Sequence, residues 1–144
     1  MSTSGKPLEL YRDTLLPALA AGLAESRRPA AAFERLIEMK VSFDTDRTRA
    51  LEDTRWWSAL ALSGADRDVH DPLEMERRAD AQSLERIASR WIVSTDPEEQ
   101  VERIAPYVEM GFRHLVFHAP GPDQARFLAL YAEQVVPRLR KRFP

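Results

Sequence analysis

Polar side chains recur near the carboxyl ends of the predicted strands. Residues 35–44 alternate between apolar and polar, and Lys40 and Asp44 fall on the polar side of that alternation. His118 lies near the end of a later predicted strand, residues 113–119. Ammonium, carboxylate and imidazole groups at strand ends can bind a polar ligand. Lys40, Asp44 and His118 could therefore line a pocket, and the alternatives are a salt-bridged polar layer and a structural histidine.

The sequence does not contain the residues that several kinds of catalytic chemistry require. There is no cysteine, which excludes a thiolate nucleophile, a disulfide and a thiolate metal site. His70 and His114 have no second ligand at metal spacing, so we predict no metal site. No glycine-rich phosphate loop, Ser-His-Asp order or nucleophile elbow occurs. The residues by themselves indicate no catalytic group.

Helices and strands alternate along the chain. Apolar residues spaced three or four apart predict helices, whereas alternation or short apolar runs predict strands. Strands separated by helices indicate βα units with a parallel sheet, whose functional loops follow the strand ends. The predicted strands are residues 35–44, 90–95 and 113–119, and the predicted helices are residues 8–24, 45–62, 71–79, 83–89, 96–111 and 123–140.

Aspartate and glycine residues predict where these helices begin and end. Asp71 and Asp96 each precede a proline that would occupy the first helical position. Asp44 or Thr45 is expected to cap the predicted helix of residues 45–62. Gly111 is the expected C-cap of the helix that Asp96 begins.

Other features predict structure rather than binding. Pro17 and Pro137 are expected to kink or weaken the first and last helices. Trp56 and Trp57 are expected to pack against the helices around them. A cluster of cations near the carboxyl end is expected to be solvated and favoured by the helix dipole, and it consists of Arg138, Arg140, Lys141 and Arg142.

Composition indicates an ordinary globular domain. The 144 residues are 44% apolar and 31% charged, and 21 basic against 23 acidic residues give a formal charge of −2. This balance excludes a strongly basic nucleic-acid binder, and no apolar run reaches the length of a membrane helix. The first residues lack a basic and then apolar leader, so a cytoplasmic location is expected by default.

Five short segments, taken in order, carry a family resemblance. They are Thr-Ser-Gly-Lys-Pro at 3–7, Glu-Met-Lys-Val-Ser-Phe-Asp at 38–44, Asp-Pro-Leu-Glu-Met-Glu at 71–76, Arg-Trp-Ile-Val-Ser at 90–94 and His-Leu-Val-Phe-His-Ala-Pro-Gly at 114–121. The series resembles the luciferase-like monooxygenase superfamily. Within it, the chain is similar to the C-terminal part of the glucose-6-phosphate dehydrogenases that use the deazaflavin coenzyme F420.

The resemblance implies a fold larger than this chain. The family fold is a (β/α)₈ TIM barrel with insertions, which typically needs ~250 residues. Residues 1–144 would supply about the last three βα units, as the C-terminal half of one α/β barrel domain, beginning after a strand that is missing. The family's catalytic residues and most of its F420 pocket lie in the other half. We therefore expect no catalytic residue here and no activity from the chain alone.

The resemblance also implies a substrate phosphate site. The family's threonine and lysine of the first segment map to Thr3 and Lys6, a basic loop residue maps to Arg67, and the arginine before the Trp-Ile-Val strand maps to Arg90. A phosphate ester is a dianion near neutral pH and is bound by converging cations and hydroxyl donors. The implied ligand is a sugar phosphate such as glucose 6-phosphate.

Other interpretations stay open at this point. Activity could require a chain carrying the N-terminal half, or a homodimer that assembles a pseudo-barrel. The chain could instead be a non-catalytic remnant that oligomerises or binds sugar phosphate. It could also be a fragment of an FMN-dependent luciferase-like monooxygenase. No nucleic acid or membrane partner is predicted.

Overall fold

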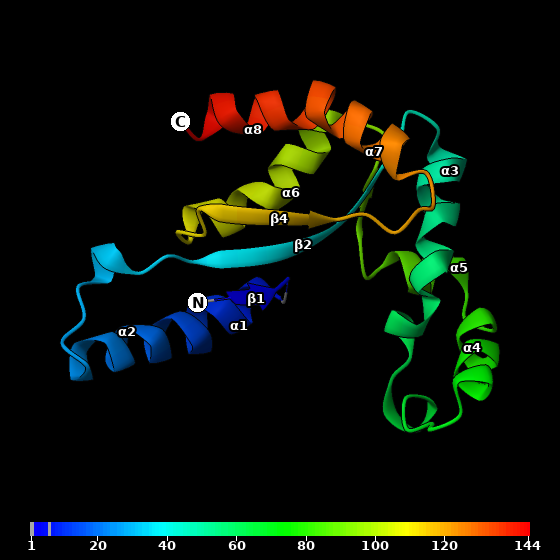
Figure 1. Ribbon diagram of the computed structural model, residues 1–144, viewed down its shortest axis with the longest axis horizontal. Coiled ribbons are helices and arrows are strands. Elements are labelled where there is room, and N and C mark those ends of the chain that lie inside the picture. The colour runs from blue at the N-terminus through cyan, green and yellow to red at the C-terminus, as the bar shows by residue number, and fades with distance from the viewer. Residues whose placement is uncertain (1, 6) are drawn as a thin grey trace. The chain divides into compact units, whose positions relative to one another are not determined.

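The computed structural model describes residues 2–5 and 7–144. The chain forms two compact units, one from Met1–Met39 with Glu102–His118 and the other from Lys40–Val101 with Ala119–Pro144. Strand β2 (Leu36–Phe43) and helix α6 (Pro97–Glu109) each contribute residues to both units (Figure 1). No helix within the described residues is long and apolar enough to cross a membrane.

In the first unit, β2 is the strand to which the others pair. Strand β1 (Ser2–Ser4) runs parallel to β2 in the register Ser2↔Leu36 to Ser4↔Glu38. Strand β4 (His114–His118) also pairs with β2. Residues 2–4, which no predicted strand included, therefore form a short strand. Three small polar residues carry no apolar pattern, and only pairing with β2 makes them a strand.

One helical segment of the first unit continues past a proline. It consists of α1 (Leu8–Leu10), a π turn (Tyr11–Leu15) and α2 (Leu16–Glu25). Pro17 has no N–H and would crowd the carbonyl four residues before it. The π turn widens the helix just before Pro17, and the Leu16 N–H donates to the Tyr11 carbonyl. The predicted weak point is therefore a π turn inside a continuous helix.

The C-terminal segment of the second unit has the same arrangement. It consists of α7 (Gln124–Leu130), a π turn (Tyr131–Val135) and α8 (Val136–Arg142). Again the first residue of the π turn is a buried tyrosine, Tyr131, and Pro137 lies six residues after this tyrosine. The sequences Tyr-x₄-Leu-Pro and Tyr-x₄-Val-Pro therefore form the same local structure, a π turn that lets the helix continue past an internal proline.

Gly111 ends α6 as predicted and places an aromatic residue in the core of the first unit. The Phe112 N–H donates to Tyr107 and the Gly111 N–H to Val108, which is the Schellman pattern. Gly111 has φ +89°, a conformation that strains any residue with a Cβ. Phe112 is fully buried, and its ring lies edge-on to Tyr11 with the centroids 5.2 Å apart.

In the second unit, the second half of β2 pairs with β3 (Ile92–Ser94). The strands are parallel in the register Val41↔Ile92 to Phe43↔Ser94. The fully buried Gln100 amide donates to the Ile92 carbonyl at 2.9 Å and to the Ser42 carbonyl at 3.4 Å. Tyr131 donates its hydroxyl to the Gln100 side-chain oxygen at 3.4 Å. Gln100 thus ties both strands to the π turn before α8.

Short helices cover the rest of the second unit. They are α3 (Arg47–Glu52), the 3₁₀ segment η3 (Asp53–Ala61), a 3₁₀ turn (Gly64–Asp66), α4 (Pro72–Asp80) and α5 (Leu84–Ala88). Asp71 caps α4 as predicted, by accepting from the Leu73 N–H. Asp46 caps α3, so the prediction of Asp44 or Thr45 is wrong: the Asp44 carboxylate accepts the Asp46 N–H instead.

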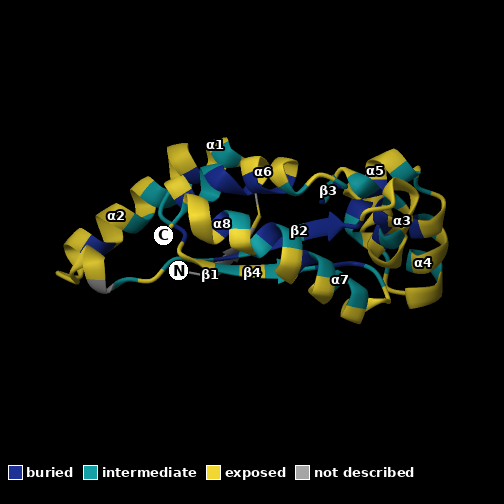
Figure 2. Cartoon of the chain, turned by 90° about the horizontal axis from the view of Figure 1, so that it is seen from above, coloured by how far each residue is buried: buried dark blue, intermediate teal, exposed yellow. Residues whose placement is uncertain are grey.

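The burial pattern confirms the apolar side of β2. Ile37, Met39, Val41 and Phe43 are all buried, and Figure 2 shows β2 as a buried strand. The prediction that Trp56 and Trp57 pack is wrong for Trp56 and holds only in part for Trp57. Trp56 is 68% exposed and Trp57 is 45% exposed, because η3 bends at Trp57 and departs from the helical period.

Replacing Gly111 with Ala should destabilise the protein by about 1–2 kcal/mol, because φ is positive and a Cβ there disfavours the native backbone. That Cβ would also lie 2.5 Å from Arg35 Nη1, which donates to the Met110 carbonyl at 2.7 Å. Equilibrium unfolding in urea measures the change.

Gly22→Ala is the matched control. Gly22 lies in α2, and nothing lies within 4 Å of where its Cβ would be. Alanine there should stabilise the protein by about 0.5–1 kcal/mol. Equal effects of the two substitutions would contradict the C-cap assignment.

Candidate functional site

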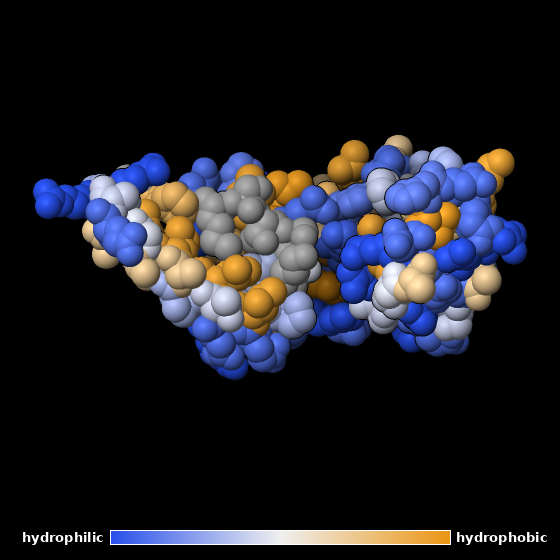
Figure 3. Space-filling model, turned by 90° about the horizontal axis from the view of Figure 1, so that it is seen from below, coloured by the Kyte–Doolittle hydropathy of each residue, from blue (hydrophilic) through white to orange (hydrophobic). Residues whose placement is uncertain are grey.

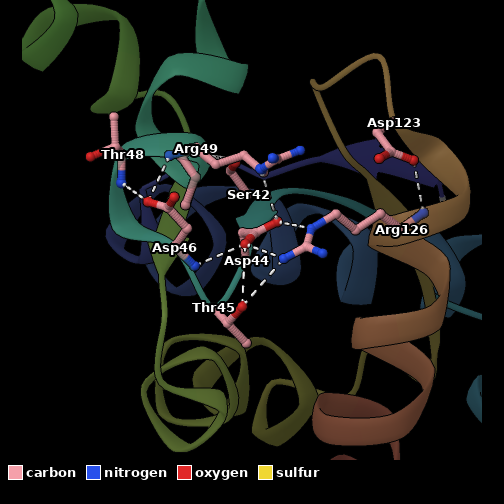
Figure 4. Close-up of polar contacts among 9 residues, drawn as sticks. Ser42, Asp44, Thr45, Asp46, Thr48, Arg49, Asp123 and Arg126 are labelled. Carbon is pink, nitrogen blue, oxygen red and sulfur yellow. Dashed lines mark hydrogen bonds and ion pairs between the residues drawn. The ribbon is translucent and has the colours of Figure 1, made fainter.

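A bidentate ion pair occupies the carboxyl end of β2. The Asp44 side chain is 5% exposed and is held by Arg126, which lies in the first turn of α7 (Figure 4). The Arg126 Nε donates to Asp44 Oδ2 at 2.6 Å, and Nη2 donates to Oδ1 at 2.9 Å. Parallel hydrogen bonds of this kind are strong and directional. The pair therefore links the loop after β2 to the start of α7.

Neighbouring groups also stabilise the ionised form of Asp44. The Asp46 N–H donates to Oδ1 at 2.8 Å, and the Arg49 guanidinium lies 3.9 Å from Oδ2. Hydrogen bonding from Arg126 lowers the pKa of Asp44 below its ordinary value, and it outweighs burial, which acts in the opposite direction. Asp44 is therefore a carboxylate at neutral pH with its charge already compensated.

The hollow beside this ion pair is almost closed. Its walls include Ser42, Asp53, Gly121 and Phe127, and its volume of about 10 Å³ has room for roughly one water. Burial raises the pKa of Asp53 above its ordinary value. A Cβ on Gly121 would lie 2.3 Å from Asp53 Oδ2, so glycine is needed for the loop to approach this carboxylate.

The residues at this strand end do not fit a deazaflavin. A tricyclic ring needs a slot between side chains, whereas the ion pair leaves about 10 Å³. A larger hollow of the second unit, about 560 Å³, lies between η3 and α4 and shares no lining residue with the hollow at the strand end. No three His, Asp or Glu side chains among residues 2–5 and 7–144 gather as metal ligands.

The residues predicted to line a pocket have separate environments. Asp44 is in the ion pair above. Lys40 is half-buried on β2. His118, at the end of β4, has its Nδ1 3.4 Å from the Glu38 carboxylate, within the first unit. A shared pocket for the three residues stays a prediction.

The predicted phosphate-binding residues lie in three segments of the sequence. The Thr3 backbone pairs with Ile37 in β1, whereas its side chain and the whole of Lys6 lie outside the described residues. Arg67 follows the 3₁₀ turn, and Arg90 follows α5. Both arginines are exposed, and neither side chain makes an ion pair with the part of the chain that the structure describes.

Two important residues of the second unit escaped the sequence-based predictions. Arg126 is separated from Asp44 by 82 positions, and an arginine in the first turn of a helix resembles any solvated one. Gln100 looks like an ordinary polar helix residue although it is fully buried. A weak signal was available for Gln100, because it directly precedes Val101, the first of several apolar residues spaced three or four apart in this helix.

A family model described as luciferase-like monooxygenase matches residues 1–114. F420-dependent glucose-6-phosphate dehydrogenases are similar over nearly the whole chain. The one from Nakamurella multipartita is 60% identical over 141 residues, covering 97% of this chain and 42% of the relative. That from Beutenbergia cavernae is 63% identical, with the same coverage. That from Microbacterium testaceum is 56% identical over 99% of this chain and 43% of the relative.

A solved structure shows a similar fold. An F420-dependent secondary alcohol dehydrogenase in complex with an F420–acetone adduct superposes with a TM-score of 0.75 at 22% identity. The match covers 96% of this chain and 42% of that one. The chain thus spans about two fifths of the length of the proteins it matches.

Asp44→Asn should destabilise the protein by about 1–3 kcal/mol at neutral pH. The substitution removes the buried carboxylate charge that accepts two hydrogen bonds from Arg126. The folded-state pKa of Asp44 is lowered, so its contribution is present at neutral pH. That contribution is lost as the pH falls through the lowered pKa, so the difference between variant and parent should shrink in acid. Unfolding in urea across this pH range measures it.

Asp13→Asn is the control. Asp13 pairs with the adjacent Arg12 at 2.7 Å, but its side chain is 57% exposed. Exposed pairs contribute little to stability. A pH-independent effect of Asp44→Asn, or an equal effect at Asp13, would argue against the proposed role of the ion pair.

Proposed function

Because the chain belongs to the luciferase-like monooxygenase family, we propose that it is the C-terminal portion of an F420-dependent oxidoreductase of the sugar-phosphate dehydrogenase type. The observation that carries this proposal is identity of 60–63% to F420-dependent glucose-6-phosphate dehydrogenases over 97% of the chain. The names of these relatives favour F420 over FMN as the coenzyme.

This portion would hold the phosphate group of the substrate. Arg67 and Arg90 are exposed and make no ion pair with a described residue, so their guanidinium groups can bind an incoming dianion. Thr3 and Lys6 would add a hydroxyl and an ammonium from the segment at β1. A sugar phosphate such as glucose 6-phosphate is the proposed ligand.

The redox chemistry would need residues that this chain does not contain. The relatives are more than twice as long, and the closed end of β2 leaves no slot for a deazaflavin. Val116 on β4 is 39% exposed, so this strand presents apolar surface. Exposed apolar strands tend to pair with another strand, which supports association with another polypeptide chain. We propose that the partner is a chain with the N-terminal half, or a second copy.

A second proposal is that the chain is a non-catalytic remnant that binds sugar phosphate or oligomerises. The observation that favours it is the short length relative to the matched proteins. Binding of glucose 6-phosphate is expected under both proposals, whereas activity after addition of the missing half is expected only under the first.

Glucose 6-phosphate should bind weakly to the chain, and glucose should not, because the phosphate supplies the charge that the arginines recognise. Arg67→Ala and Arg90→Ala should each weaken binding by about tenfold, the effect of a lost charge-assisted hydrogen bond. NMR titration measures both. Arg103→Ala is the control, since Arg103 is an exposed arginine with no assigned role. Binding unchanged by replacing Lys6, Arg67 and Arg90 together with Ala would refute the site.

The chain alone should not reduce F420 with glucose 6-phosphate. Absorbance of oxidised F420 follows the reaction, and adding the N-terminal half of a relative should give turnover. Turnover by the chain alone would refute the proposed incompleteness. A stable complex of the two halves that binds both ligands but gives no turnover would favour the non-catalytic remnant.

A further inference from the structure

Large apolar side chains are unusually exposed in the groove between η3 and α4. Its volume is about 560 Å³, and its walls include Trp56, Ser58, Pro72 and Leu73. Trp56 is 68% exposed and Leu73 is 74% exposed. In Figure 3, hydrophobic patches interrupt the hydrophilic surface over the part of the second unit that carries α3, α4 and α5. Tryptophan is common at the energetic centres of protein interfaces.

Two carboxylates on one wall of the groove lack a counter-charge. Glu76 and Asp80 lie one turn apart on α4 and line the groove, and neither makes an ion pair with a described residue. Like charges at this spacing repel, and Asp80 ends the helix, where the dipole disfavours a negative charge. The cation of the groove, Arg55, is already paired with Glu52 at 2.6 Å. This wall therefore favours a cationic occupant.

Ser58 adds an independent polar feature to the floor of the groove. The residue is only 7% exposed, and its hydroxyl makes no hydrogen bond with the described part of the chain. A hydroxyl in this position can donate to or accept from a group that enters the groove. The groove thus combines an indole, a hydroxyl and two carboxylates.

The chain itself carries a complementary segment at its C-terminal end. The last turn of α8 presents three consecutive exposed cations, Arg140, Lys141 and Arg142, and Phe143 follows them. Neither Arg140 nor Lys141 makes an ion pair with a described residue. The Arg142 guanidinium lies 5.4 Å from the Phe143 ring centroid, so cationic and apolar groups are presented together.

The basic turn and the groove lie at opposite ends of the second unit. Figures 1 and 2 both place the C-terminus of α8 far from α4. We propose that the groove binds the basic C-terminal turn of α8 from a second copy of the chain. The two surfaces differ, so the contact is head-to-tail and extends from copy to copy. The contact is small and mostly exposed, so the association is weak and sensitive to salt.

Charge reversal tests this proposal by sedimentation velocity from micromolar to near-millimolar concentration. The parent chain should show a sedimentation coefficient that rises with concentration and falls with added salt. The double variant E76K/D80K and the double variant R140E/K141E should each remain monomeric, because each presents like charges at the contact. An equimolar mixture of the two should associate again, since each then offers a surface complementary to the other.

Folding and specificity have their own controls. Both variants change exposed residues, and E76K/D80K should unfold at an equal or higher urea concentration because it removes the repulsion within α4. The matched variant E85K/R47E changes exposed charges on α5 and α3 that make no ion pair with a described residue, and it should associate like the parent. Monomeric parent protein at every concentration, association that persists in both charge-reversed variants, or a mixture that stays monomeric would each overturn the proposal.

Discussion

Strand β2 is the element on which the rest of the described structure depends, because every other described strand pairs with its backbone. Its first half pairs with β1, its second half pairs with β3, and β4 also pairs with it. Its side chains alternate until the carboxyl end, where the polar residues Ser42 and Asp44 are also buried. Polar groups that are buried at the end of a paired strand need hydrogen-bond partners within the protein. This requirement explains the hydrogen bonds that Ser42 and Asp44 make.

The ion pair at the end of β2 decides what this chain can contribute to chemistry. Strand ends are where barrel enzymes place their functional loops. Here Asp44 and Arg126 neutralise one another and leave a hollow of about 10 Å³. Arg67 and Arg90, which make no ion pair with a described residue, lie outside this hollow. This arrangement supports the proposal that this portion binds the phosphate group of a substrate and that the coenzyme needs residues from elsewhere.

Features that depend on neighbours in sequence were predictable. The order of helices and strands after β1, the Asp71 cap and the Gly111 C-cap were confirmed, because periodicity and terminal hydrogen bonds act over a few residues. Strand β1 was missed because its three polar residues become a strand only by pairing with β2. The cap of α3 was misplaced because Asp44 is engaged by Arg126, which leaves Asp46 to accept the helical N–H groups.

The sequence by itself determined the α/β class, the family resemblance and the position of the chain within that family, since local patterns and ordered motifs need no coordinates. Only the tertiary structure decided which charges are compensated. Asp44 finds its partner 82 positions away, whereas Glu76 and Asp80 find none among the described residues although Arg77 and Arg78 are their neighbours in sequence. The exposure of Trp56 likewise follows from the bend of η3. Burial and charge pairing depend on how distant segments meet, and that information is absent from local sequence.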